Sequence, residues 1–233
     1  MNKLQKWGGA SALYEGIAYI IGIVGFIGVV NIGEIADPVQ KVAAIVENQS
    51  ILSILHLLVY VFWGASLVVL TLALHERLQG GRYPLARTAT AFGIIWAVLV
   101  IASGMIYNIG METAASLYAT DPTQAATVWL AIESVFNGLG GGVEVVGGIW
   151  VLLLSTAALR HGGLPRLFNY FGLLVGTAGL VTIIPTLGEL GGMIFGLTQI
   201  IWFAWLGIAL LRQPDAALAE ILVPQPSTLT NLF

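Results

Sequence analysis

The sequence has 233 residues, of which 58% are hydrophobic and only 9% are charged, a composition typical of an integral membrane protein rather than a soluble domain. The absence of cysteine excludes disulfides, iron–sulfur clusters and thiol redox chemistry. The formal net charge of −3, with nine lysines and arginines scattered along the chain, excludes a nucleic-acid-binding protein.

Apolar windows of about 20 residues, the length that crosses a bilayer, predict six membrane-spanning helices. The first apolar run is too long for a cleaved signal peptide, so we expect it to be retained as a helix. The prediction is an all-α, polytopic bundle of six transmembrane helices over residues 1–212, followed by a cytoplasmic, partly disordered tail over residues 213–233. The spans lie near residues 10–31, 51–73, 88–108, 127–156, 167–186 and 190–211, and turn-forming stretches separate them.

The positive charges predict how this bundle is oriented, because lysine and arginine accumulate in loops that stay in the cytoplasm. With six spans, eight of the nine cations fall on the side of the two termini, and only Lys41 falls on the other side. We therefore expect both termini in the cytoplasm.

At the opposite end, three spans are each followed by a glycine and then a glutamate, in the strings NIGE, NIGME and TLGE. Glycine is a common helix terminator and loops carry charges, which explains much of this pattern. A carboxylate just after a helix C-terminus meets an unfavourable dipole, however, so its repetition favours an anionic outer rim. The rim would be formed by Glu34, Glu112 and Glu189.

The fourth span carries the residues least expected in a membrane. In a continuous α-helix, Glu133, Asn137 and Glu144 fall on one face, and Gly138 and Gly142 have the spacing of small residues at a helix contact. A charged carboxylate at mid-membrane costs roughly 2.5 to 3.5 kcal/mol, so both glutamates are expected to be paired, protonated or in contact with water. We predict that this face turns toward protein or water, either as a functional path or as a set of static hydrogen bonds.

The first and second spans contain possible partners for these acids. His56 is the only histidine within a span and has a similar depth to Glu133, so a hydrogen bond between the two is predicted, although a packing role for the histidine is the alternative. Tyr60 extends the same helix face at i+4. In the first span, Glu15 either reaches the membrane interface or approaches Glu144.

Small and aromatic residues mark the expected packing surfaces. Tryptophans spread over the spans are typical of belts at the lipid interface. Glycines in the last two spans predict close helix contacts, either within the chain, in a homo-oligomer or with a partner membrane complex. These glycines are Gly172, Gly176, Gly179, Gly188, Gly192 and Gly196.

Several classes of membrane enzyme and cofactor protein lack their required residues here. No lysine lies in a span, which excludes a retinal Schiff base, and a single intramembrane histidine excludes bis-histidine haem within one chain. His75 and Glu76 lack the second histidine of a zinc-protease motif, and Ser103 lacks a histidine to activate it. No metal site, catalytic residue or particular cofactor is predicted, and a role other than that of an enzyme is favoured.

Three stretches carry a family resemblance: MNKLQKWGGASALYEGIAYIIG, LHLLVYVFWGASLVVLTLAL, and GGLPRLFNYFGLLVGTAGLV followed by IIWFAWLGIALLR. Together they resemble a bacterial family of six-helix integral membrane proteins, domain of unknown function 4386, over residues 1 to about 213. The resemblance implies a single six-helix unit in the bacterial cytoplasmic membrane. It supplies no catalytic residues.

Three functions are compatible with the sequence. The first is binding or translocation of a small ligand, a cation or a proton through a polar site between the second and fourth spans. The second is an accessory or scaffold subunit that packs through its glycine faces. The third is a lipid- or quinone-directed enzyme with His56 and Glu133 as general base, although no nucleophile or cofactor motif supports it. The residues of the polar site would be Glu15, His56, Tyr60, Glu133, Asn137 and Glu144.

Overall fold

The computed structural model describes residues 3–79 and 82–212. Helices make up nearly all of these residues, which confirms the all-α prediction, and the predicted tail over 213–233 lies outside them. In chain order the helices are α1 (Lys3–Gly22), η1 (Ile23–Val30), η2 (Ile32–Glu34), α2 (Pro38–Glu47), α3 (Gln49–His56), η3 (Leu57–Phe62), α4 (Trp63–Arg77), α5 (Pro84–Tyr118), α6 (Pro122–Phe136), η4 (Asn137–Gly141), α7 (Val145–His161), α8 (Arg166–Val181) and α9 (Gly188–Arg212). The segments η1, η3 and η4 are π-helical, and η2 is a 3₁₀ turn.

The lengths and outer surfaces of the helices indicate a multi-pass membrane protein. Large apolar side chains such as Ile27, Val98, Ile109 and Leu197 are exposed on the outside of the bundle, as they are on a surface that faces lipid. Helix α8 has 16 residues and is about 24 Å long, which is short for a span. Within residues 3–79 and 82–212, five segments are long and apolar enough to cross a membrane: Lys3–Val30, Gln49–Arg77, Pro84–Tyr118, Pro122–His161 and Gly188–Arg212.

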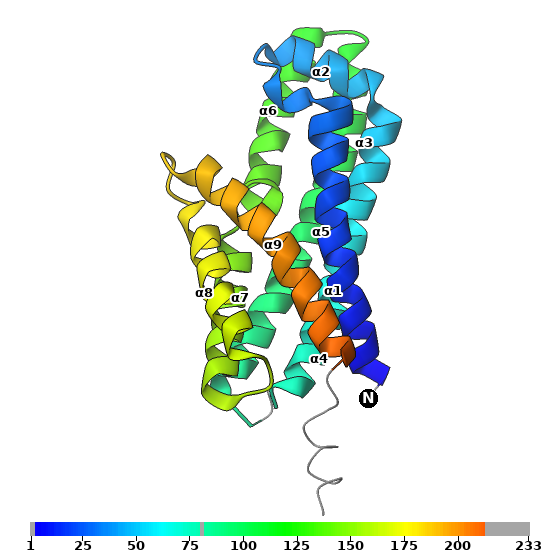
Figure 1. Cartoon of the computed structure of the whole chain (residues 1–233). Helices are drawn as coiled ribbons and strands as arrows, with labels where there is room; N and C mark the ends of the chain where they lie inside the picture. Colours follow the sequence, from blue (N-terminus) through cyan, green and yellow to red (C-terminus); the bar gives the residue numbers. More distant parts are fainter. Residues whose placement is uncertain (1–2, 80–81, 213–233) are drawn as a thin grey trace, which may run out of the picture.

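At one end of the molecule, six helices form a closed ring. Helix α1 packs against α4 and α9, α5 packs against α4 and α7, and α8 packs against α7 and α9 (Figure 1). We call this the arginine-rich end, after Lys6, Arg77, Arg87, Arg166 and Arg212 at the helix termini there.

Tryptophans fill the interior of this ring. Trp63, Trp96, Trp150 and Trp202 are buried, and successive ring centroids along this series lie 4.9, 5.5 and 5.5 Å apart. For these four residues the prediction of belts at the lipid interface is wrong, because aromatic side chains of this size stabilise the bundle more by filling its core.

The opposite end is narrower, and we call it the capped end. The hairpin of α8 and α9 stops short of it, whereas α5 runs on to Tyr118 and reaches a length of about 52 Å (Figure 1). Helix α2 lies across this end and contacts α5 and α6. The cap begins at Asp37, whose side chain accepts a hydrogen bond from the Gln40 backbone N–H at 2.8 Å, with Pro38 at the first helical position.

Of the three glycine–glutamate strings, only NIGE follows a helix end as predicted, because η1 ends at Val30. Helix α5 continues through Gly110 and Glu112, because the following turns bury Ala114 against the core of the capped end. Gly188 begins α9 rather than ending α8. After η1 it is Asn31, with φ of 41°, that takes the left-handed conformation of a helix terminator.

The prediction of one continuous helix over 127–156 is also wrong. Helix α6 ends at Phe136, η4 follows, and α7 begins only at Val145. Within η4, Gly140 has φ of 134° and ψ of 12°, a conformation open to glycine but not to residues with a Cβ. The run of glycines therefore breaks the helix here, and Glu133, Asn137 and Glu144 do not share one face.

Two hydroxyl groups from neighbouring helices hold this break in place. The Ser103 Oγ of α5 donates to the Phe136 carbonyl at 3.0 Å. On the other side, the Glu144 backbone N–H donates to Thr182 Oγ1 at 2.9 Å, just beyond the end of α8. The break is thus a positioned part of the fold rather than a frayed helix.

Candidate functional site

Two pockets lie beside the break between α6 and α7, and Tyr60 of η3 lines both. The larger, which we call the capped-end pocket, has a volume of about 300 Å³ and is lined by Phe26, Val30, Ile32, Gly33, Lys41, Leu52, His56, Tyr60, Tyr107, Glu133, Phe136 and Gly141. The smaller, which we call the Glu144 pocket, has a volume of about 70 Å³ and is lined by Tyr19, Val59, Tyr60, Trp63, Trp96, Val100, Gly140 and Glu144.

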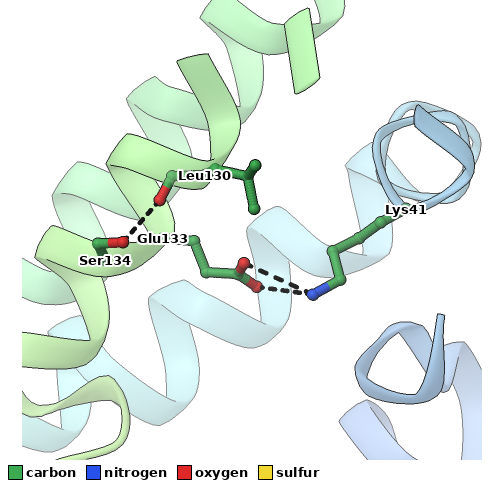
Figure 2. Close-up of polar contacts among 4 residues, drawn as sticks. All are labelled: Lys41, Leu130, Glu133 and Ser134. Carbon is green, nitrogen blue, oxygen red and sulfur yellow. Dashed lines mark hydrogen bonds and ion pairs between the residues drawn. The ribbon is translucent and has the colours of Figure 1, made fainter. Parts of the chain in front are cut away.

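In the capped-end pocket, Glu133 is paired with a lysine. The Lys41 ammonium of α2 donates to Glu133 Oε1 at 3.2 Å and lies 3.5 Å from Oε2 (Figure 2). Only 18% of the Lys41 side chain and 28% of the Glu133 side chain are exposed. The pair therefore lies mostly out of solvent, where water and salt screen its attraction less than they screen a surface pair.

The predicted hydrogen bond between His56 and Glu133 is wrong. The His56 Nδ1 lies 2.8 Å from the Leu52 carbonyl oxygen, one turn earlier in the same helix. The lysine on the covering helix α2 takes the carboxylate instead, and an ammonium neutralises it more fully than a histidine hydrogen bond. Both side chains nevertheless line the same pocket, as their similar depth suggested.

Aromatic rings form much of the wall around this ion pair. The His56 ring stacks on Tyr107 with a centroid distance of 3.6 Å and on Tyr60 at 5.2 Å. Phe26 lies 4.9 Å from His56 on another side, and Phe136 lies 5.7 Å away, edge to face. The histidine is therefore both a packing residue and part of the pocket wall.

The Glu144 pocket places a carboxylate among hydroxyl and indole groups. Because Glu144 directly precedes α7, the break brings its side chain to the interior between α1, α4 and α5. Tyr60 and Tyr19 line the same pocket as the carboxylate. The indole nitrogens of Trp63 and Trp96 are buried without a hydrogen-bond partner in the part of the chain that the structure describes.

Glu15 lies deeper toward the arginine-rich end and is completely buried. The interface alternative is therefore wrong. Glu15 lies one turn before Tyr19 on α1, and Tyr19 lines the Glu144 pocket. The other alternative was an approach of Glu15 to Glu144, and in the structure both residues are neighbours of Tyr19.

In the described part of the chain, all three π-helical segments contribute residues to these pockets. Phe26 comes from η1, Tyr60 from η3 and Gly140 from η4. The Tyr14 hydroxyl of α1 donates to the Leu58 carbonyl of η3 at 2.8 Å, which ties one of these segments to its neighbour. Single π-helical turns inside α-helices occur frequently at functional sites, so their grouping here marks this region of the bundle.

Other predicted residues lie outside the pockets. Asn137 is exposed, and its side chain lies beside Gly142 of its own loop. Glu34, Glu112 and Glu189 of the predicted rim are exposed on three separate elements. Over residues 3–79 and 82–212, no group of three acidic, histidine or cysteine side chains is arranged to hold a metal ion.

The glycine faces serve mainly the inside of the chain. A Cβ at Gly148 of α7 would lie 2.7 Å from the Gly176 carbonyl oxygen of α8, and Gly179 is as close to α7. Gly192 of α9 faces open space, as does Gly138, and a Cβ at Gly142 would meet only Asn137, so Gly138 and Gly142 do not pack against another helix of the same chain. The glycines of α8 are thus engaged within the chain.

Sequence reasoning missed three residues of the site. Lys41 was counted only as a loop charge, although its isolation from the other cations was a signal. Tyr19 follows Glu15 by four residues and so shares its helix face. Tyr107 carries no such signal, because its part of α5 was predicted as the end of a span.

Comparison with known proteins places the chain in a family. The family model described as domain of unknown function (DUF4386) matches residues 15–213, and the chain belongs to this family. No curated protein and no solved structure matches the chain.

Proposed function

We propose that this DUF4386 protein moves protons across the membrane along a column of carboxyl and phenol groups inside the bundle. The observation that carries the proposal is that Tyr60 lines both pockets, with Glu133 in one and Glu144 in the other. From the capped end to the arginine-rich end, the column consists of Glu133, Tyr107, Tyr60, Glu144, Tyr19 and Glu15. The first three line the capped-end pocket, Tyr60, Glu144 and Tyr19 line the Glu144 pocket, and Glu15 lies one turn before Tyr19 on α1.

The chemistry of these groups suits proton transfer. Carboxyl and phenol groups both donate and accept protons, and intramembrane acids that face the interior of a bundle commonly belong to proton relays. The Glu144 pocket, at about 70 Å³, has room for a few water molecules and has polar groups to bind them. Water there would link the carboxylate to the two tyrosine hydroxyls.

We also propose the membrane arrangement that such a column requires. Helix α8 would act as a sixth span, because it closes the ring between α7 and α9 and exposes apolar Leu167 and Leu174. The excess of lysine and arginine at the arginine-rich end supports cytoplasmic termini in a bacterial cytoplasmic membrane. Reporter fusions after Arg212 test this: a cytoplasmic reporter should be active there and a periplasmic one inactive, and the reverse result contradicts it.

Proton flux into proteoliposomes tests the function. A potassium diffusion potential drives the protons, and an enclosed dye reports the pH of the lumen. The sign of the potential sets the direction of the pH change, and this change should be faster with the wild-type protein than in protein-free liposomes. The variant Glu144→Gln should fall to the protein-free rate, because it removes the only titratable carboxyl that lines the described Glu144 pocket. The matched control is Glu189→Gln, an exposed acid outside the column. Wild-type flux at the protein-free rate, or full flux in Glu144→Gln, refutes the proposal.

A further inference from the structure

The capped-end pocket has the composition of a binding site as well as a position at the start of the column. We propose that this pocket binds a small zwitterion whose positive end is a quaternary ammonium group. That group would lie against the aromatic wall beside Glu133, and the carboxylate of the ligand would lie on Lys41. This inference rests on the proposed function only in sharing its pocket, since binding needs no proton movement.

The aromatic wall would bind the positive end of the ligand. Phe26, Tyr60, Tyr107 and Phe136 line the pocket together with the His56 ring. Aromatic faces carry partial negative charge, and aromatic rings that line one cavity are the groups that bind quaternary ammonium ligands.

Charge balance selects a zwitterion over a simple ion. Among the described residues, Lys41 is the only lysine or arginine in the pocket wall and Glu133 the only carboxylate. A simple cation on Glu133 would leave Lys41 unpaired in a mostly buried position, and a simple anion on Lys41 would do the same to Glu133, which is costly. A zwitterion inserted between the two gives each a new partner of opposite charge.

The size of the pocket limits the ligand. A volume of about 300 Å³ is at the lower end of the range for small-molecule sites, so the ligand is a compact molecule rather than a lipid or a peptide. The wall comes from η1, η2, α2, α3, η3, α5, α6 and η4, which surround the pocket from several directions. Helix α2, which carries Lys41, also covers this end of the bundle (Figure 1).

Glycine betaine and its isosteres test the charge requirement. Glycine betaine carries both charges, choline lacks the carboxylate, and 3,3-dimethylbutyrate has carbon in place of the charged nitrogen. Binding is measured on the full-length protein in nanodiscs without a pH gradient, by isothermal titration and by the shift in melting temperature. We expect saturable binding of glycine betaine and at least about tenfold weaker binding of both isosteres, the loss that corresponds to one missing charged contact. No binding of glycine betaine, or equal binding of all three compounds, overturns the inference.

Variants locate the binding to this pocket. Lys41→Gln should weaken glycine betaine binding at least about tenfold and lower the preference over choline, because the partner of the ligand carboxylate is lost. The matched control Glu47→Gln removes an exposed charge of α2 and should bind as the wild type does. Tyr107→Phe keeps the ring and should retain most affinity, whereas Tyr107→Leu should not. Unchanged affinity in both Lys41→Gln and Tyr107→Leu places the binding elsewhere and refutes the site, whatever the proton flux shows.

Discussion

The break in the fourth span can be tested by adding a single methyl group at Gly140. In Gly140→Ala the new Cβ would lie 3.6 Å from Val100 Cγ2, an ordinary contact, so crowding contributes little. The cost comes from the backbone, since φ of 134° with ψ of 12° lies outside the regions open to alanine. Holding a residue in such a conformation costs about 1–3 kcal/mol. A loss of about 2 kcal/mol raises the unfolded fraction roughly 30-fold.

Thermal and denaturant unfolding in detergent measure this cost, with Gly138→Ala as the matched control. Gly138 lies in the same π-helical segment, and a Cβ added there would have no atom within 4 Å. Its φ is not positive, so alanine can adopt its backbone conformation. Gly138→Ala should therefore leave the free energy of unfolding unchanged or raise it slightly. Gly140→Ala should also lower proton flux, because a relaxed backbone would move Glu144. Equal stability of the two variants would refute the proposed geometry of the break.

Three further sets of variants test other parts of the structure. Lys41→Gln and Glu133→Gln should each lower the free energy of unfolding by about 1–2 kcal/mol, since each leaves a mostly buried charge unpaired, and the double variant should lose less than the sum in a double-mutant cycle. Gly148→Ala should cost about 3 kcal/mol in denaturant unfolding because its Cβ meets backbone atoms of α8, whereas Gly192→Ala, in open space, should be neutral or stabilising. Ser103→Ala should cost about 1 kcal/mol by the same assay, through loss of its hydrogen bond across the break, and no change would mean that this bond does not hold it.

The sequence predicts the helical class and most spans because each depends on local composition. Twenty apolar residues make a membrane helix wherever they occur in the chain. Helix ends were harder, because α5 is extended past Glu112 by packing against α6, which local signals do not record. The break at Gly140 was not predicted for a related reason. A run of glycines can either pack in a continuous helix or break it, and the residues around it decide which of the two occurs.

In the candidate site, too, local sequence predicts some features, whereas others depend on contacts between distant parts of the chain. That Glu133 and Glu144 need partners follows from the cost of burying charge, and both lie in polar pockets. The partner of Glu133 was not predictable, because Lys41 is 92 residues away in the chain and belongs to a helix that local patterns assign to a loop. The burial of Glu15 was not predictable either, because its position one turn inside a span is compatible with both the membrane interface and the protein core.

In a hydrated proton column, the interior around Glu144 contacts water while the outer surface of the same helices does not, and cysteine accessibility tests this difference directly. The wild-type chain has no cysteine, so Val100→Cys and Val98→Cys each supply a single thiol on α5 at nearly the same depth. Val100 lines the Glu144 pocket and is 5% exposed, whereas Val98 is 57% exposed on the outside. In membranes, Ag⁺, a small water-borne thiol reagent, should block later maleimide labelling of Val100→Cys and leave Val98→Cys unprotected. Faster reaction at Val98→Cys, or no reaction at Val100→Cys, would contradict a hydrated column.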